Sequence, residues 1–312
     1  MTEFDFIKKN LRGVHNYLPT PFHSDYRLDS YGMKDNVSYH VSTNHRDMTI
    51  TVGGGYGEGF TLDPEEHRDL VEAAVEGASG KIHIMAGVVG GYGVQKLMAR
   101  NAENAGAGSI IVFFPRQQTP TVDIAYSYLR SLAESVNIGV IIFPFGTHEL
   151  WTEVLEKLAD VPNVVGFLAP NVNPEYTVEF GKTVNKVVPG RYIWIAENEN
   201  HAMPSFAHGC EAYTAAAPAI VPDSSWEFWS HGVAGDIEFM GRVFEKMVSP
   251  INKIRSFKPG HGISGIKVAL EILGRHGGPP RPPEFSVEKD DREIIRDILL
   301  SHSETRHIVE GR

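Results

Sequence analysis

Eight short β-rich runs alternate with helical patterns along most of this 312-residue chain. Two of the runs, SIIVFF and IGVIIF, are almost continuously apolar, which is typical of parallel strands buried on both faces. Eight β/α units in series fold either into a closed barrel or into a doubly wound sheet. The predicted strands are Val14–Leu18, Met48–Val52, Ile82–Ala86, Ser109–Phe114, Ile138–Phe143, Asn163–Leu168, Tyr192–Ala196 and Ala212–Ala216.

The glycine-rich stretches distinguish these two folds, because a doubly wound dinucleotide-binding sheet carries G-x-G-x-x-G after a strand. Neither VGGGYGEGF at 52–60 nor AGVVGGYGV at 86–94 has that spacing. The phosphate-binding pattern G-x-x-x-x-G-K-[ST] is also absent from the sequence. We therefore predict an α/β fold, a (β/α)8 TIM barrel with a C-terminal helical extension.

The helical segments have recognisable starts and continue to the end of the chain. Asp63 with Glu66 forms a capping-box pattern after strand two, and Asn173 before a proline caps the helix after strand six. From about residue 223 the pattern is helical, and no long linker precedes it. We expect residues 1–222 to form the barrel, and residues 223–312 to form helices packed on it in the same structural unit.

The charge and cysteine content exclude several classes of partner. The chain has 29 basic and 39 acidic residues and a net charge of -10, a balance that repels nucleic acid and anionic membranes. The single cysteine, Cys210, allows no internal disulfide. The charged N-terminus lacks an apolar signal region, and no apolar run approaches the ~20 residues of a membrane span. We expect a cytoplasmic protein that binds a small molecule and copies of itself.

Several motifs, in order along nearly the whole chain, carry a family resemblance. They are GVHNYLPTPF, GGYGEGFTLDPEEH, NVVGF in strand six, AHGCEAYTAAAPAIVP, and KVALEILG followed by PPRPP. Together they resemble the dihydrodipicolinate synthase / N-acetylneuraminate lyase family. The resemblance implies a homotetrameric barrel that binds a 2-oxo acid at its mouth and acts as a lyase. It also implies a lysine at the end of strand six that forms an imine, and a tyrosine at the end of strand five that moves protons.

The sequence departs from the family at the positions that carry this chemistry. Leu168 stands where the family has the imine-forming lysine, and Phe143 stands where it has the tyrosine. The family motif G-T-T-G-E reads Gly54-Gly55-Tyr56-Gly57-Glu58, so both hydroxyl residues are replaced. None of the 13 lysines falls at the carboxyl end of a predicted strand, where barrel enzymes place their chemistry. We predict that the chain forms no imine.

Other polar residues follow the predicted strands and are candidates for the site. Tyr56 is a candidate proton donor, with simple packing as the alternative. Arg116 is a candidate carboxylate clamp, with a surface ion pair as the alternative. Gln117 and Thr20 are candidate substrate contacts. For Glu58 we expect a structural role, bracing its loop by accepting backbone hydrogen bonds.

The run Ala196-Glu197-Asn198-Glu199-Asn200-His201 is the strongest polar cluster. In an extended stretch Glu197 and Glu199 share a face, so they are candidates for a general acid/base pair, with Asn198 as a substrate contact. Oxygen and nitrogen ligation of a divalent metal is an alternative, and helix capping is another. No second histidine has ligand spacing. We therefore predict neither a metal nor a cofactor.

Two hypotheses about function follow. The first is a lyase-like enzyme that dehydrates, isomerises or opens a lactone of a small hydroxy or oxo carboxylic acid without an imine. Glu197 or Glu199 would be its base, Tyr56 its acid and Arg116 its carboxylate contact. The second is a family member that has lost catalysis and binds a metabolite or a partner.

Overall fold

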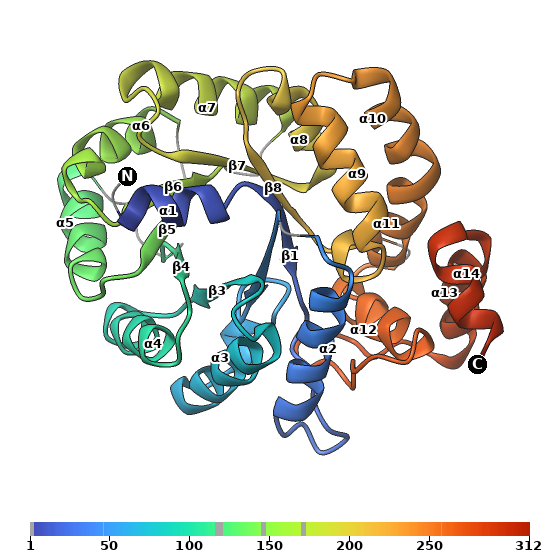
Figure 1. Cartoon of the computed structure of the whole chain (residues 1–312). Helices are drawn as coiled ribbons and strands as arrows, with labels where there is room; N and C mark the ends of the chain where they lie inside the picture. The colour runs from blue at the N-terminus through green and yellow to red at the C-terminus, as the bar shows by residue number, and fades with distance from the viewer. Residues whose placement is uncertain (1–2, 46, 116–120, 145–147, 170–172, 257) are drawn as a thin grey trace.

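The computed structural model describes residues 3–45, 47–115, 121–144, 148–169, 173–256 and 258–312. Within them, eight parallel strands close into a barrel in chain order, with β1 paired to both β2 and β8 (Figure 1). All eight predicted strands are present, and each boundary lies within two residues of its predicted place. The strands are β1 Gly13–Tyr17, β2 Met48–Val52, β3 His83–Val88, β4 Ser109–Phe113, β5 Gly139–Phe143, β6 Val164–Leu168, β7 Ile193–Glu197 and β8 Ala212–Ala215.

A ring of helices covers the outside of the barrel (Figure 1). The predicted helix starts are confirmed: Asp63 and Glu66 form a capping box on α3, and the Asn173 side chain caps α7. These caps satisfy backbone N–H groups that the first turn of a helix leaves without a partner. The ring consists of α2 Ser30–Ser42, α3 Pro64–Ala78, α4 Tyr92–Asn104, α5 Val122–Ala133, α6 His148–Lys157, α7 Pro174–Val187, α8 Asn198–Phe206 and α9 Pro222–Val233.

A short N-terminal helix, α1 Glu3–Asn10, packs on β5 and β6. Its Ile7 side chain lies so close to the Cα of Gly139 that a larger residue at the start of β5 would collide with it. The amino-terminal end of the barrel is therefore covered by the chain's own first helix, and the carboxyl end remains for the chemistry.

The C-terminal segment packs on one side of the ring. A π-helical turn, η4 Phe244–Val248, joins the first two of its helices, and α13 and α14 lie outside α11 and α12 (Figure 1). The helix α9, which begins at the expected boundary near residue 222, packs against β1 and α8 and completes the ring. The extension proper is α10 Ile237–Val243, α11 Ser249–Ser256, α12 Gly262–Ile272, α13 Lys289–Ser301 and α14 Ser303–Glu310.

Among the described residues, no helix combines the length and the apolar character that crossing a membrane requires.

Candidate active site

Alternation along the strands determines which side chains face the barrel interior. Trp194 of β7 packs against Gly181 of α7, so it points outward and its neighbours in the strand point inward. Phe167 of β6 likewise packs on Phe180 of α7, with ring centroids 5.4 Å apart. Because successive side chains in a strand point to opposite faces, Glu197 and Leu168 face the interior at the barrel mouth.

The same argument places residues of β1 and β8. Asn16 points outward, where its amide lies 3.1 Å from His40 Nε2 on α2. Tyr213 also points outward and packs on Phe228 of α9, with ring centroids 5.3 Å apart. Tyr17 and Thr214 therefore face the interior beside Glu197, whose register partner in β8 is Thr214.

A glycine-rich loop after β2 brings Tyr56 to these residues. Gly57 and Gly59 approach the backbone of Gly53 so closely that a Cβ atom on either would collide with it. The loop therefore folds back on itself, and its tip presents Tyr56 to Tyr17, with ring centroids 6.1 Å apart at 82°. The glycines thus serve a tight turn and not a phosphate site.

We call Tyr17, Tyr56, Glu197 and Thr214 the polar side of the mouth. Two residues of α11 complete it: the Arg255 guanidinium lies 4.3 Å from the Tyr56 ring centroid, and Asn252 donates a 3.1 Å hydrogen bond to Glu199 Oε2. In this region several buried polar atoms make no hydrogen bond to another described residue. They are Thr51 Oγ1, Glu199 Oε1, Asn252 Oδ1 and Arg255 Nε. The buried hydroxyls of Tyr17 and Thr214 interact with each other. A concentration of such atoms is typical of a site that binds polar ligands.

Both tyrosines at the mouth hold their protons at neutral pH. Burial raises the pKa of Tyr56 to about 12; Arg255 opposes this rise, and Glu197 and Glu199 reinforce it. Burial, together with the negative charge of Glu197, raises the pKa of Tyr17 further. Two protonated phenols beside a carboxylate can donate hydrogen bonds to an oxygen on which negative charge develops.

The opposite side of the mouth is apolar. Phe113 and Phe143 end the paired strands β4 and β5 and pack edge to face, with ring centroids 5.2 Å apart. Phe60, in the loop after β2, packs on Phe113 with ring centroids 6.0 Å apart. Leu168 is buried at the end of β6. We call Phe113, Phe143 and Leu168 the apolar side of the mouth. Its side chains offer no group that could accept or donate a proton.

Comparisons with known proteins identify the family. A model of the Dihydrodipicolinate synthetase family matches residues 10–302. The chain belongs to this family. A Bacillus licheniformis protein named "Probable 5-dehydro-4-deoxyglucarate dehydratase" is 26% identical over 303 residues, which are 94% of each chain. A Bradyrhizobium diazoefficiens protein of the same name is 27% identical over 275 residues, covering 87% of this chain and 86% of the relative.

Solved structures support the fold of this family member. Dihydrodipicolinate synthase from Oceanobacillus iheyensis superposes with a TM-score of 0.83 at 23% identity, covering 96% of this chain and 99% of that one. The enzyme of the same name from Aquifex aeolicus gives a TM-score of 0.83 at 20% identity, covering 94% and 99%. The predicted TIM barrel with a helical extension is confirmed.

Within this family frame, the predicted acid/base pair has a different geometry from the one expected. The premise that Glu197 and Glu199 share a face of an extended stretch is wrong, because Glu197 ends β7 and Glu199 lies in the first turn of α8. Glu197 faces the interior and is partly exposed. Glu199 is buried against α11, and this burial raises its pKa. Both carboxyls nevertheless lie close enough to influence Tyr56.

Other predicted site residues have structural contacts. The Thr20 hydroxyl donates a 2.5 Å hydrogen bond to the Gly57 carbonyl and so supports the loop that carries Tyr56. The Asn198 side chain accepts the backbone N–H of Asn200 at 3.0 Å, which is the capping role considered as an alternative. His201 faces α7, where its Nδ1 lies 2.7 Å from Thr177 Oγ1. Arg116 and Gln117 lie outside the described residues and stay predictions.

Glu58 has the bracing role expected for it. Its Oε2 accepts a 2.8 Å hydrogen bond from the Arg281 backbone N–H, and its Oε1 is ion-paired to Lys267. Lys267, on α12, is fully buried and also donates to the Pro279 carbonyl at 3.0 Å. This lysine therefore joins the C-terminal extension to the β2 loop, and its buried amine is held by Glu58 and the Pro279 carbonyl.

Sequence reasoning missed Tyr17, Thr214, Asn252 and Arg255. The strand pattern contained a signal for Tyr17, which is next to the last residue of its predicted strand. The two α11 residues had no local signal, because only the packing of the extension brings them to the mouth. In the described part of the chain, no three His, Cys, Asp or Glu side chains gather closely enough to hold a metal ion.

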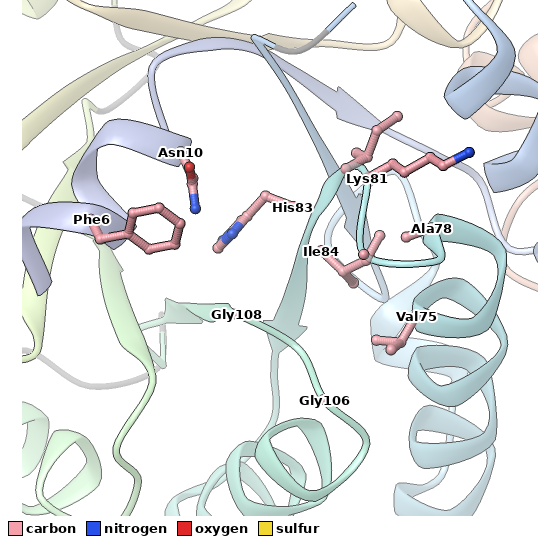
Figure 2. A pocket seen from close by; sticks show the side chains of 11 residues that line it. Phe6, Asn10, Val75, Ala78, Lys81, His83, Ile84, Gly106 and Gly108 are labelled. Carbon is pink, nitrogen blue, oxygen red and sulfur yellow. The ribbon is translucent and has the colours of Figure 1, made fainter. Parts of the chain in front are cut away.

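A hollow away from the mouth lies at the amino-terminal ends of β3 and β4. This cavity of about 330 Å³ is bordered by Phe6 and Asn10 of α1, which face His83 across it (Figure 2). The His83 imidazole is 2.8 Å from the Ser109 hydroxyl. Because barrel enzymes place their chemistry at the carboxyl ends of the strands, the mouth and not this hollow is the candidate active site.

Proposed function

We propose that this chain is a dehydratase that removes water from a small hydroxy/oxo carboxylic acid of the 5-dehydro-4-deoxyglucarate class. Two features support the proposal. The family match and the names of the relatives indicate a lyase acting on such acids. The polar side of the mouth offers a carboxylate and two protonated phenols next to one another, and this observation carries the proposal.

The chemistry of this substrate class defines what the site must supply. The name 5-dehydro-4-deoxyglucarate places a ketone at C5, a methylene at C4 and a hydroxyl at C3. Dehydration removes a proton from C4 and the hydroxyl from C3, and the C4–H bonding pair first moves toward the ketone oxygen. The site therefore needs a base for the proton, hydrogen-bond donors for the oxygen, and an acid for the leaving hydroxyl.

Residues of the polar side match these three needs. Glu197, which faces inward from β7, takes the C4 proton. Tyr17 and Tyr56 donate hydrogen bonds to the ketone oxygen as its negative charge develops. The electron pair on the enolate oxygen then re-forms the ketone, the C4=C3 double bond forms and the C3–O bond breaks. Tyr56 gives its proton to the departing oxygen and takes one from Glu197. The water released thus consists of the C3 hydroxyl and the proton removed from C4.

The apolar side offers no amine that could form an imine, so a route through an enolate fits it better. Leu168 and Phe143 place hydrocarbon at the ends of β6 and β5. The segments that follow the eight strands contain no lysine in sequence. Lys267, the fully buried lysine, is engaged by Glu58. The proposal is therefore dehydration without a covalent intermediate.

The remaining sequence predictions belong to the same proposal. Arg116 and Gln117 stay predicted substrate contacts. A homotetramer in the cytoplasm is the expected state, by analogy with the family. Glu199, whose carboxyl is buried against α11, supports the proton donors at the mouth and is not the base.

Turnover of 5-dehydro-4-deoxyglucarate by the purified chain tests the proposal. We expect NMR to show loss of the substrate and, in D2O, exchange at C4. The Tyr56→Phe variant should lose about 100-fold or more in kcat, the lower end of the range for a lost acid/base group. The matched control is Tyr31→Phe, because Tyr31 is 72% exposed on α2, and it should leave kcat unchanged. No turnover of this acid by the wild-type chain would favour a catalytically silent binding protein instead.

Borohydride reduction in the presence of pyruvate, followed by intact mass, tests the imine-free part separately. We expect no covalent adduct. An adduct on any lysine would contradict this part of the proposal while leaving the dehydratase assignment open to the turnover assay.

A further inference from the structure

Arg255 is a cation at the mouth that forms no ion pair with a described carboxylate, although its charge opposes the rise in the pKa of the nearby Glu199 carboxyl. Its guanidinium lies 4.3 Å from the ring centroid of Tyr56, and its Nε is buried without a hydrogen bond to any described residue. No carboxylate in the described chain lies within ion-pair distance of it. Two other arginines near buried regions have partners, Arg281 in Glu66 and Arg275 in the Ala219 carbonyl.

The position of the Arg255 guanidinium over the Tyr56 ring leaves N–H groups available to bind an anion. A guanidinium that stacks on an aromatic ring keeps its N–H edge available for bidentate hydrogen bonds to a carboxylate. The ring beneath it is that of Tyr56, which in turn contacts Tyr17 at 6.1 Å between centroids. An acid group held by Arg255 would therefore lie next to the two phenols that receive the ketone oxygen.

Contacts on two sides of α11, the helix that carries Arg255, fix its position in the fold. Asn252 lies one turn earlier on the same face of α11 and donates to Glu199 Oε2 at 3.1 Å, which ties α11 to α8. Ile251 and Ile254, on the adjoining side of the helix, are buried in the core. The π-helical turn at Phe244–Val248 directly precedes α11, and such turns alter the rotation of the residues that follow and are frequent at functional sites.

We propose that Arg255 binds a carboxylate of the substrate, so that the C-terminal extension supplies one wall of the active site. The ligand class is a small mono- or dicarboxylate, and only the choice of substrate rests on the proposed function. Asn252 acts as a positioning residue, because it reaches the ligand only through the placement of α11.

Calorimetric titration of the full chain with glutarate tests this proposal without requiring turnover. We expect Arg255→Gln to weaken glutarate binding about 10- to 100-fold, because charge-assisted hydrogen bonds are lost, and Arg255→Lys to weaken it less. The matched control is Lys253→Gln, which removes one positive charge from the exposed face of the same helix and should leave the affinity unchanged. Binding of the uncharged diamide of glutarate should not depend on residue 255.

Kinetics then separate a binding role from a merely structural one. With 5-dehydro-4-deoxyglucarate, Arg255→Gln should raise KM by about tenfold or more and change kcat much less, because a contact with a spectator carboxylate is made in both ground and transition states. A wild-type chain that binds no glutarate at millimolar concentration, or an Arg255→Gln variant that binds it as the wild type does, overturns the inference. If the Arg255 variants lose glutarate but the wild type dehydrates nothing, the carboxylate site stands and the proposed function falls.

Discussion

The side chains that end β4, β5 and β6 at the mouth are apolar and buried, whereas those of Tyr17, Glu197 and Thr214 on β1, β7 and β8 carry polar atoms. On the apolar side, Phe113 and Phe143 are in edge-to-face contact and Leu168 is buried. On the polar side, the buried hydroxyls of Tyr17 and Thr214 interact with each other, while Glu199 Oε1 and Asn252 Oδ1 have no hydrogen bond to a described residue. Both sides are formed by parallel strands of the same barrel, so they differ only in the side chains that they present at the mouth.

This difference indicates that the apolar side contributes to stability and the polar side to ligand binding. A packed aromatic pair contributes to the free energy of unfolding through burial and ring contacts. A buried polar atom without a partner costs about 1–3 kcal/mol, and a protein keeps such atoms where a ligand uses them. In the family pattern the imine and its tyrosine occupy β6 and β5. In this chain we infer that the chemistry lies across the mouth, on β1 and β7.

The largest expected effect on stability comes from the apolar side. Phe143→Ala removes a ring that is 8% exposed and packed on Phe113, so we expect it to lower the free energy of unfolding by about 3–5 kcal/mol. Urea denaturation measures this loss. Phe143→Met, which keeps an apolar side chain of intermediate size, should cost less than the alanine change. An alanine variant as stable as the wild type would mean that the apolar side is not a packing unit.

A smaller effect, with a pH signature, comes from Glu199 on the polar side. Burial raises the pKa of this carboxyl in the folded state, so between the unfolded and folded pKa values the folded chain binds more protons than the unfolded chain. Its contribution to stability is therefore present below the usual glutamate pKa of 4.5 and is lost as pH rises through the folded pKa. Glu199→Gln keeps the oxygen that accepts from Asn252 and should be more stable than the wild type at pH 7.

Urea denaturation of both proteins at pH 5 and pH 7 checks this slope. We expect the stability advantage of the Glu199→Gln variant to grow with pH. The exposed control Glu179→Gln on α7 should show no such change. An advantage that shrinks between pH 5 and pH 7 would contradict the raised pKa.

The smallest expected effect comes from Thr214. Thr214→Val replaces a buried hydroxyl next to the Tyr17 phenol with a methyl group of similar size, so stability should change by no more than about 1 kcal/mol. Thermal unfolding detects the change. A loss of more than about 1 kcal/mol would show that the hydroxyl is engaged in the folded protein.

The sequence predicted the fold well because its signals are local. Continuous apolar runs such as SIIVFF mark strands buried on both faces, and Asp63 with Glu66 marks a helix start by side chains only three residues apart. Each of these patterns depends on neighbours in the chain, and the barrel follows from repeating them eight times. The structure changed strand ends by at most two residues.

The candidate site was predicted only in part, because part of it depends on packing between distant segments. Tyr56 and Glu197 follow strands and could be selected from sequence. The separation of Glu197 from Glu199 could not, because it depends on α8 beginning directly after β7. Arg255 is about 200 residues from Tyr56 in sequence and meets it only because α11 packs at the mouth.

A comparison of kcat in two variants on neighbouring strands tests the central claim most directly. Glu197→Gln, at the end of β7, removes the proposed base on the polar side. Leu168→Met, at the end of β6, makes a volume-conserving change at the family's imine position. With 5-dehydro-4-deoxyglucarate we predict that Glu197→Gln loses about 100- to 10,000-fold in kcat, while Leu168→Met stays within a few-fold of the wild type. A Glu197→Gln variant with wild-type kcat would contradict the account, because the chemistry would then not depend on the polar side.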